Sequence, residues 1–199
     1  MGAALPPPEL VLASGSPRRR ELLGHLGVPF RVLASDLPEV SAHTAPAEVA
    51  RDLAEQKARA VRALLGEAPA LILAADTLVA LEGRLLGKPR DAAQNAEYLR
   101  LLSGQTHTVY SGVALIGPDG LNSGVEATRV AFRGLSEAEM QHYAASGEGL
   151  DKAGGYGVQG LGMALVARIE GDYSGVVGFP LSLVIRLLRG AGVPVWGQA

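Results

Sequence analysis

Hydroxyl and guanidinium side chains gather in residues 14–20, which read SGSPRRR and lie between a predicted strand and a predicted helix. The N-terminus of a helix presents free backbone N–H groups and the positive end of the helix dipole, so it can bind an anion. Ser14, Arg18 and Arg19 would add donors suited to a phosphate group. The segment lacks the Walker A pattern. It therefore indicates a phosphate site or, alternatively, an ordinary Ser-Pro helix start with solvated arginines.

An acidic residue, Asp76, directly follows the apolar run ALILAA at residues 70–75. Open α/β sheets bind their ligands at the carboxyl ends of their strands, and this pattern places Asp76 at such an end. A carboxylate there could act as a general base or as a ligand of a divalent cation. The alternative is an aspartate that begins a turn.

Lysine is scarce, because only Lys57, Lys88 and Lys152 occur among 18 basic residues. Where arginine supplies the general surface charge, a lysine can mark a position that needs a compact ammonium group. Lys57 lies on the apolar stripe of a predicted helix, so its ammonium either extends to solvent or points into a cleft. Lys88 lies in a Gly-Lys-Pro turn. The alternative is that these are three leftover surface lysines.

Glycine is concentrated in the second half, and residues 155–160 match the pattern G-x-G-x-x-G. A dinucleotide fingerprint needs a strand before it and a helix after it, and neither is predicted here. The better interpretation is a loop whose backbone approaches a ligand closely. Gln159 in this loop can both donate hydrogen bonds to a base and accept them. The four histidines show no metal-ligand spacing.

Composition excludes several classes of protein. The 199 residues are 48% hydrophobic and 19% charged, which is typical of a globular domain and excludes a disordered chain. The absence of cysteine excludes disulfide scaffolds, iron–sulfur clusters and thiol catalysis. A net charge of −2 argues against a nucleic-acid partner. The N-terminal residues do not resemble a signal peptide, and no apolar run predicts a membrane helix, so we expect a cytoplasmic protein with no membrane partner.

Periodicity and capping residues predict the elements that would position these side chains. Strands are expected over residues 9–13, 30–34, 70–75 and, with a turn, 77–86. Helices are expected over residues 18–26, 46–65 and 91–103. The second half is expected to contain a hairpin over 107–132, a helix over 136–146, a strand over 163–169 and a helix over 181–189. Ser16 and Ser136 are the predicted caps of two helices. This order predicts an α/β fold with a mixed twisted sheet, flanking helices and two lobes around a cleft.

Six motifs, in this order, resemble the Maf family of nucleoside triphosphate pyrophosphatases. They are LASGSPRR at residues 12–19, AADT at 74–77, GKPRD, SGQTH, DKAGGYGVQG at 151–160, and GDYSGVVGFPL. The combination of SPRR, ADT and YGVQG is similar to the family branch that hydrolyses dTTP and UTP. The resemblance implies a fold like that of inosine triphosphatases, with one domain over residues 1–199. Its N-terminal lobe would cover about 9–104 and its C-terminal lobe about 105–190.

The resemblance also implies a chemistry, namely hydrolysis of a nucleoside triphosphate to the monophosphate and pyrophosphate with Mg²⁺ or Mn²⁺. Asp76 would be the proton acceptor that activates water, and Asp76 and Glu39 would bind the metal. Nucleotide specificity would depend on Arg18, Thr77 and Gln159. The phosphates would be held by Ser14, Arg19, Lys57 and Lys88. Pro38 stands where the family usually has a second acid beside Glu39.

The resemblance further implies a homodimer, and it leaves alternatives open. The same fold could prefer 7-methyl-GTP or inosine triphosphate. The protein could instead be a nucleotide-binding regulator of septum formation in which hydrolysis is incidental. A nucleic-acid binder built on residues 18–20 is disfavoured by 5% aromatic residues and by the net charge.

Overall fold

A mixed sheet of seven strands runs the length of the computed structural model, which describes residues 8–36 and 38–197. The strands are β1 (Glu9–Leu12), β2 (Arg31–Val32), β3 (Ala70–Leu81), β4 (Arg84–Leu86), β5 (Thr106–Gly117), β6 (Gly120–Phe132) and β7 (Val166–Glu170). They lie in the order β2-β1-β3-β5-β6-β7, and β4 pairs with β3. β1 is parallel to β2 and β3, whereas the pairs among β3 to β7 are antiparallel.

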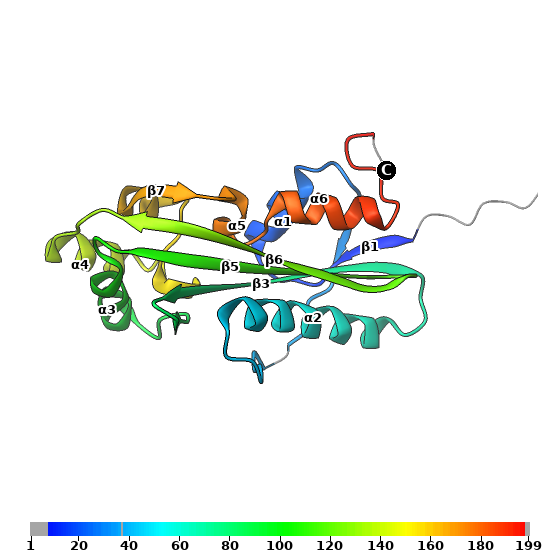
Figure 1. Cartoon of the computed structure of the whole chain (residues 1–199), viewed down its shortest axis with the longest axis horizontal. Helices are drawn as coiled ribbons and strands as arrows, with labels where there is room; N and C mark the ends of the chain where they lie inside the picture. Colours follow the sequence, from blue (N-terminus) through cyan, green and yellow to red (C-terminus); the bar gives the residue numbers. More distant parts are fainter. Residues whose placement is uncertain (1–7, 37, 198–199) are drawn as a thin grey trace, which may run out of the picture.

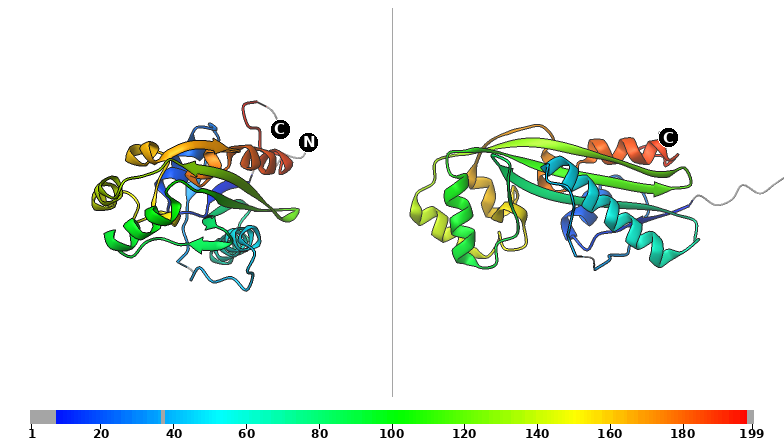
Figure 2. Two further views of the ribbon diagram at one scale, coloured as in Figure 1. Left: turned by 60° about the vertical axis from the view of Figure 1, so that its left-hand side comes forward. Right: turned by 60° about the horizontal axis from the view of Figure 1, so that its bottom comes forward.

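Helices cover both faces of this sheet and one of its ends. They are α1 (Pro17–Gly24), α2 (Pro46–Leu65), α3 (Ala92–Leu102), α4 (Glu137–Ser146), α5 (Tyr173–Val177) and α6 (Leu181–Gly190). Figure 1 shows α2 along one face and α1 with α6 along the other, while α3 and α4 lie together at the far end, as Figure 2 also shows. This is the predicted mixed α/β fold. The division into two lobes near residue 104 stays a prediction.

Alternation along β1 and β3 divides the core into two layers. Leu10, Leu12, Leu71 and Leu73 pack with residues of α1 and α6, whereas Val11, Ile72 and Ala74 pack with Ala54, Ala58 and Val61 of α2. Successive side chains of a strand point to opposite faces of a sheet. Asp76 and Thr77, further along β3, follow the same rule, so Asp76 faces α2 and Thr77 faces α1 and α5.

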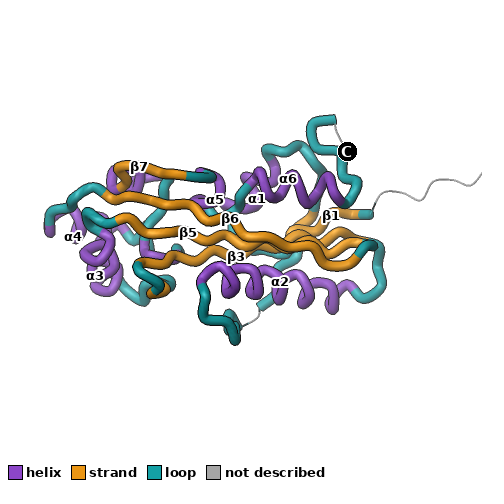
Figure 3. Tube along the Cα trace, in the orientation of Figure 1, coloured by secondary structure: helices purple, strands orange, loops and turns teal. Residues whose placement is uncertain are grey.

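The strand β3 is one continuous element of 12 residues (Figure 3), although the sequence pattern predicted a break at Asp76. Asp76 therefore lies in the middle of a strand and not at its end. The strand continues because β5 pairs with it from Ile72 to Ala80. On its other edge β1 ends opposite Leu73 and β4 begins opposite Leu81 and ends opposite Val79. Between Leu73 and Val79 this edge of β3 is paired with neither β1 nor β4. It lies just beyond the carboxyl end of β1, which is where open α/β sheets bind their ligands.

Other boundaries differ from the predictions in smaller ways. The short helix α5 was not predicted, and the 3-10 turns η1 (Ala153–Gly155) and η2 (Gly160–Leu165) occupy residues expected to be loop or strand. The predicted caps are confirmed, because the Ser16 hydroxyl accepts from the Arg19 N–H and Ser136 forms a capping box with Glu139. No helix within residues 8–36 and 38–197 is long and apolar enough to cross a membrane.

We predict that Gly112→Ala strongly destabilises the protein. A Cβ atom at Gly112 would lie 2.2 Å from the carbonyl oxygen of Ala50, so α2 would have to move away from the sheet. The free energy of unfolding in urea should fall by about 3 kcal/mol. Gly134→Ala is the matched control, because a Cβ there meets no atom within 4 Å. Equal stability of the two variants would contradict the close packing of α2.

We predict that the free energy of unfolding decreases as the pH is lowered from about 6.5 to 4, because of His107. Burial lowers the pKa of His107 from 6.5 to about 4. The unfolded chain therefore binds one more proton than the folded chain in this window, and protonation favours unfolding. The loss should reach up to about 3 kcal/mol near pH 4. Urea unfolding at pH 7 and pH 4.5 should show a shallower pH dependence in His107→Gln, and an unchanged slope would contradict the assignment.

Candidate active site

A cleft of about 450 Å³ opens at the edge of β3 that follows the end of β1. Its walls come from α1, the loop before α2, α2 itself, β3, the loop after β4 and the glycine-rich segment between α4 and β7. All nine site residues predicted from the sequence line this one cleft: Ser14, Arg18, Arg19, Glu39, Lys57, Asp76, Thr77, Lys88 and Gln159. The fold thus brings together residues that are up to 145 positions apart, and the roles of these residues stay predictions.

The ammonium of Lys57 lies between two carboxylates. Lys57 Nζ donates to Asp76 Oδ1 in a short contact and to Glu39 Oε1 at 2.9 Å. The Asp76 side chain is 6% exposed and the Glu39 side chain 49% exposed. Partial burial would raise the pKa of Glu39, but the hydrogen bond and charge of Lys57 outweigh this and lower the pKa below its ordinary value. Lys57 thus points into the cleft, one of the two alternatives left open by its position on the helix.

Arg19 is the centre of a second group of contacts, on the other face of β3. Its guanidinium donates to the Gly178 carbonyl at 2.9 Å, to Thr77 Oγ1 at 3.2 Å and to Ser14 Oγ at 3.3 Å. Burial lowers the pKa of Arg19, although the negative charge of Asp76 acts in the opposite direction. Three of its five N–H groups are used in these contacts, which leaves two for an anion. Arg19 therefore joins α1 to β3 and to the loop after α5.

The Thr77 hydroxyl forms a hydrogen bond with Ser111 on β5. The two hydroxyl oxygens are 2.9 Å apart, and Ser111 donates to the Gly175 carbonyl at 2.7 Å. Ser111 is fully buried, and it pairs with Thr77 across the β3–β5 ladder. These contacts fix the rotamer of Thr77, so its position at the cleft depends on α5 as well as on β3.

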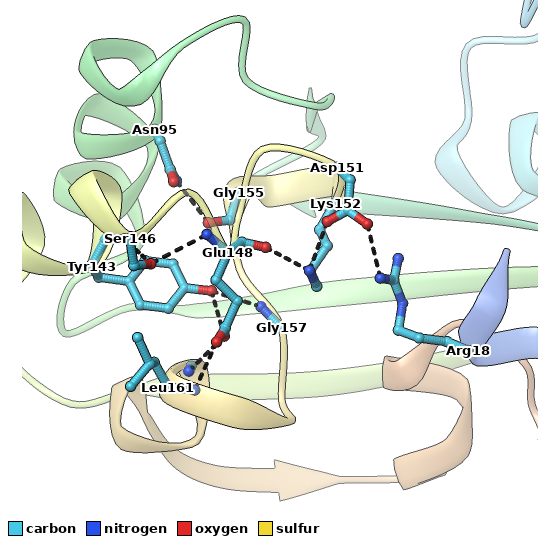
Figure 4. Close-up of polar contacts among 11 residues, drawn as sticks. Arg18, Asn95, Tyr143, Ser146, Glu148, Asp151, Lys152, Gly155, Gly157 and Leu161 are labelled. Atoms are coloured by element: carbon cyan, nitrogen blue, oxygen red, sulfur yellow. Dashed lines mark hydrogen bonds and ion pairs between the residues drawn. The ribbon is translucent and has the colours of Figure 1, made fainter. Parts of the chain in front are cut away.

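Arg18 reaches across the cleft to the glycine-rich segment. Its Nη1 atom donates to Asp151 Oδ2 at 3.0 Å, and Lys152 Nζ donates to Asp151 Oδ1 at 2.7 Å (Figure 4). Partial burial would raise the pKa of Asp151, but the hydrogen bonds from Lys152 and Arg18 lower it below its ordinary value. Both Asp151 and Lys152 line the cleft. Sequence reasoning assigned no role to either one, although both stand in the motif at residues 151–160.

A family model described as "Maf-like protein" matches residues 9–191. The chain belongs to the Maf family. It is 62% identical over 190 residues to a Deinococcus radiodurans protein named dTTP/UTP pyrophosphatase, with 96% of each chain covered. A Moorella thermoacetica protein of the same name is 53% identical over 195 residues, which cover 96% of this chain and 98% of the relative.

The solved structure of the Staphylococcus aureus Ham1 protein has a TM-score of 0.53 to this Maf protein at 14% identity. It covers 92% of this chain and 96% of the Ham1 chain. At that identity the likeness concerns the fold alone. It confirms the predicted fold class, a mixed sheet with flanking helices.

Two carboxylates in the cleft of this Maf protein could take part in binding a divalent cation. Within the part of the chain that the structure describes, no three or more His, Asp or Glu side chains form a group that could hold a metal ion. Asp76 and Glu39 supply two carboxylates, and a cationic group, the ammonium of Lys57, already lies between them. Mg²⁺ is commonly held by one or two carboxylates together with substrate phosphates and water. The donor set therefore fits such an ion.

We predict that Lys57→Met destabilises this Maf protein by about 3 kcal/mol, because the buried Asp76 carboxylate loses its partner. Urea unfolding at pH 7 measures the loss. In the same variant the pKa of Glu39 should rise, since Lys57 is its principal favourable contact. Glu39→Gln is the control. The half-exposed side chain of Glu39 should contribute less than about 1 kcal/mol to the free energy of unfolding. Equal losses in the two variants would contradict the prediction that Lys57 stabilises the fold mainly through buried Asp76.

Proposed function

We propose that this Maf protein is an enzyme that hydrolyses dTTP and UTP to the monophosphate and pyrophosphate and so removes excess nucleotides. CTP and modified pyrimidine nucleotides are further candidate substrates. The observation that carries the proposal is that the Asp76 carboxylate shares a cleft with a cluster of basic side chains, among them Arg18, Arg19, Lys57 and Lys88. The names of the Deinococcus and Moorella relatives, which match nearly end to end, support the choice of nucleotide.

Asp76 is the proposed general base. A water molecule adds its oxygen to the α-phosphorus, Asp76 accepts a proton from that water, and the bridging oxygen leaves with pyrophosphate. A water molecule and a triphosphate would both be within reach of a carboxylate that lines the cleft. General-base catalysis of this kind contributes about 10²- to 10⁴-fold to a rate.

The basic side chains would hold the phosphates. Phosphoryl transfer depends mainly on positioning and on neutralising charge, which clustered cations provide. Ser14, Arg19, Lys57 and Lys88 are the proposed phosphate contacts. Asp76 and Glu39 would bind Mg²⁺ or Mn²⁺, which would neutralise charge on the phosphates when bound.

Three residues that line the cleft would read the nucleotide. Arg18 and Gln159 come from opposite walls, and the amide of Gln159 has both a donor and an acceptor for a pyrimidine edge. Thr77 would contribute through the position that Ser111 and Arg19 give its hydroxyl. A preference for 7-methyl-GTP or inosine triphosphate, and a role as a nucleotide-binding regulator of septum formation, remain the alternatives.

The remaining expectations concern assembly and location. A homodimer, a cytoplasmic location and the absence of nucleic-acid and membrane partners stay predictions. Steady-state rates of pyrophosphate release across the common nucleoside triphosphates and 7-methyl-GTP would test the substrate. A preference for dTTP and UTP is the expected result, and tight nucleotide binding with negligible turnover would favour the regulator instead.

We predict that Asp76→Asn lowers kcat for dTTP by about 10³-fold, because the amide cannot accept the proton from water. Nucleotide binding should stay measurable by calorimetry, since the basic side chains are unchanged. Asp119→Asn is the matched control. Asp119 is an exposed aspartate in the turn between β5 and β6, outside the cleft, so its turnover should equal that of the wild type. Near-normal activity of Asp76→Asn would refute the base assignment.

A further inference from the structure

The segment that carries Gln159 lies between α4 and β7 and contains only the short turns η1 and η2. Backbone N–H groups that are not paired within a helix or a sheet need other acceptors. Three of them, those of Gly157, Leu161 and Gly162, are accepted by just two side chains, Tyr143 and Glu148. Both acceptors come from the end of α4 and the turn that follows it.

The carboxylate of Glu148 binds two backbone N–H groups near the end of the segment. Its Oε2 atom accepts from the Leu161 N–H at 2.8 Å, and its Oε1 atom accepts from the Gly162 N–H at 2.9 Å. Partial burial would raise the pKa of Glu148, but these two N–H groups and the Tyr143 hydroxyl lower it below its ordinary value. An ionised carboxylate that accepts several N–H bonds forms stronger hydrogen bonds than a neutral group would.

Tyr143 holds the segment on the other side of Gln159. The tyrosine residue is 3% exposed, and its hydroxyl donates to Glu148 Oε1 at 3.0 Å and accepts from the Gly157 N–H at 3.1 Å. Figure 4 shows the tyrosine and the carboxylate between Gly157 and Leu161. Residues on both sides of Gln159 are therefore tied to one pair of side chains.

Two glycines, Gly160 and Gly162, allow the backbone of the segment to pack closely against Glu148 and against itself. A Cβ atom at Gly162 would lie 1.8 Å from the Gly157 carbonyl oxygen. Gly160 has φ +67°, and a Cβ there would lie 2.5 Å from Glu148 Oε2. The segment is thus shaped around the carboxylate, and its conformation needs both the glycines and the anchor.

The same anchor is connected to Arg18 on the opposite wall. The backbone carbonyl of Glu148 accepts from Lys152 Nζ, and Lys152 donates in turn to Asp151, which binds Arg18. Figure 4 shows this path from Glu148 through Lys152 and Asp151 to Arg18. Two of the three residues proposed to read the nucleotide, Gln159 and Arg18, are thus linked to the turn at Glu148.

We infer that Glu148 and Tyr143 are positioning residues that set the nucleotide preference of the cleft by holding Gln159 in place. Neither side chain lines the cleft, and the backbone groups that the two side chains bind belong to Gly157, Leu161 and Gly162, so we expect their effect on the substrate to pass through residues 157–162. This inference rests on the proposed function, and it adds two residues to the three expected to determine specificity.

The test compares dTTP with dATP, which share a sugar and a triphosphate and differ only in the base. In Tyr143→Phe and Glu148→Gln we expect the KM for dTTP to rise about 10-fold while kcat changes less than about 3-fold. The kinetic constants for dATP should change little, so the preference for dTTP over dATP should fall about 10-fold. Glu148→Gln replaces one acceptor oxygen with an NH₂ group that faces a backbone N–H.

Glu139→Gln is the matched control. Glu139 also accepts a backbone N–H, that of Ser136 at 2.7 Å, but at the opposite end of α4. It should keep the nucleotide preference of the wild type even where its melting temperature falls. A second check is the double variant with Gln159→Ala. If Glu148 acts through Gln159, then Glu148→Gln should cause little further loss of preference in that background.

The outcomes separate the inference from the proposed function. Equal loss of kcat/KM for dTTP and dATP, or effects that add to those of Gln159→Ala, would show a merely structural role and overturn the inference. Tyr143→Phe decides it where Glu148→Gln does not fold. If the wild type hydrolyses neither nucleotide, the proposed function fails, and equilibrium dissociation constants for dTTP and dATP then decide the inference. The inference is supported if the wild type binds dTTP more tightly than dATP and the two variants lose this preference. It is overturned if the wild type shows no such preference or if the variants keep it.

Discussion

The cleft depends on a difference in length between two neighbouring strands. β1 pairs with β3 only as far as Leu73, whereas β5 supports the opposite edge of β3 as far as Ala80. The chain leaving β1 therefore turns away at Ser14, and β3 continues alone on that edge until β4 pairs with it. A ligand can approach β3 there without breaking the sheet, because the hydrogen bonds to β5 hold the strand extended.

Strand alternation then divides the chemistry between two faces. Asp76 faces α2 and meets Lys57, while its neighbour Thr77 faces α1 and meets Arg19. Gly112, which pairs with Asp76, lets α2 lie against the sheet at this level. One dipeptide of β3 thus presents a carboxylate to one group of contacts and a hydroxyl to another. A shift of the strand by one residue would exchange the two side chains between the faces.

Sequence patterns predict much of this arrangement. Apolar runs, alternation and capping residues such as Ser16 and Ser136 are local signals, so the helices, the hairpin and the mixed sheet could be expected from them. The continuity of β3 through Asp76 could not, because the pairing with β5 that extends the strand is a contact between distant segments. The same reason applies to the links from Arg18 to Asp151 and from Thr77 to Ser111. The motifs predicted nine site residues, but only the three-dimensional structure shows which of their side chains are in contact.

The glycine-rich segment illustrates the difference between composition and structure. Glycine usually suggests a flexible backbone. Here Gly160 and Gly162 have almost no free space, because the Glu148 carboxylate and the Gly157 carbonyl oxygen occupy the positions that side chains would need. Besides its two short 3-10 turns, the segment is held by hydrogen bonds that its backbone N–H groups donate to the side chains of Tyr143 and Glu148. Glycine therefore serves close packing around an ionised carboxylate, and the wall of the cleft that carries Gln159 is as specifically built as the strand opposite it.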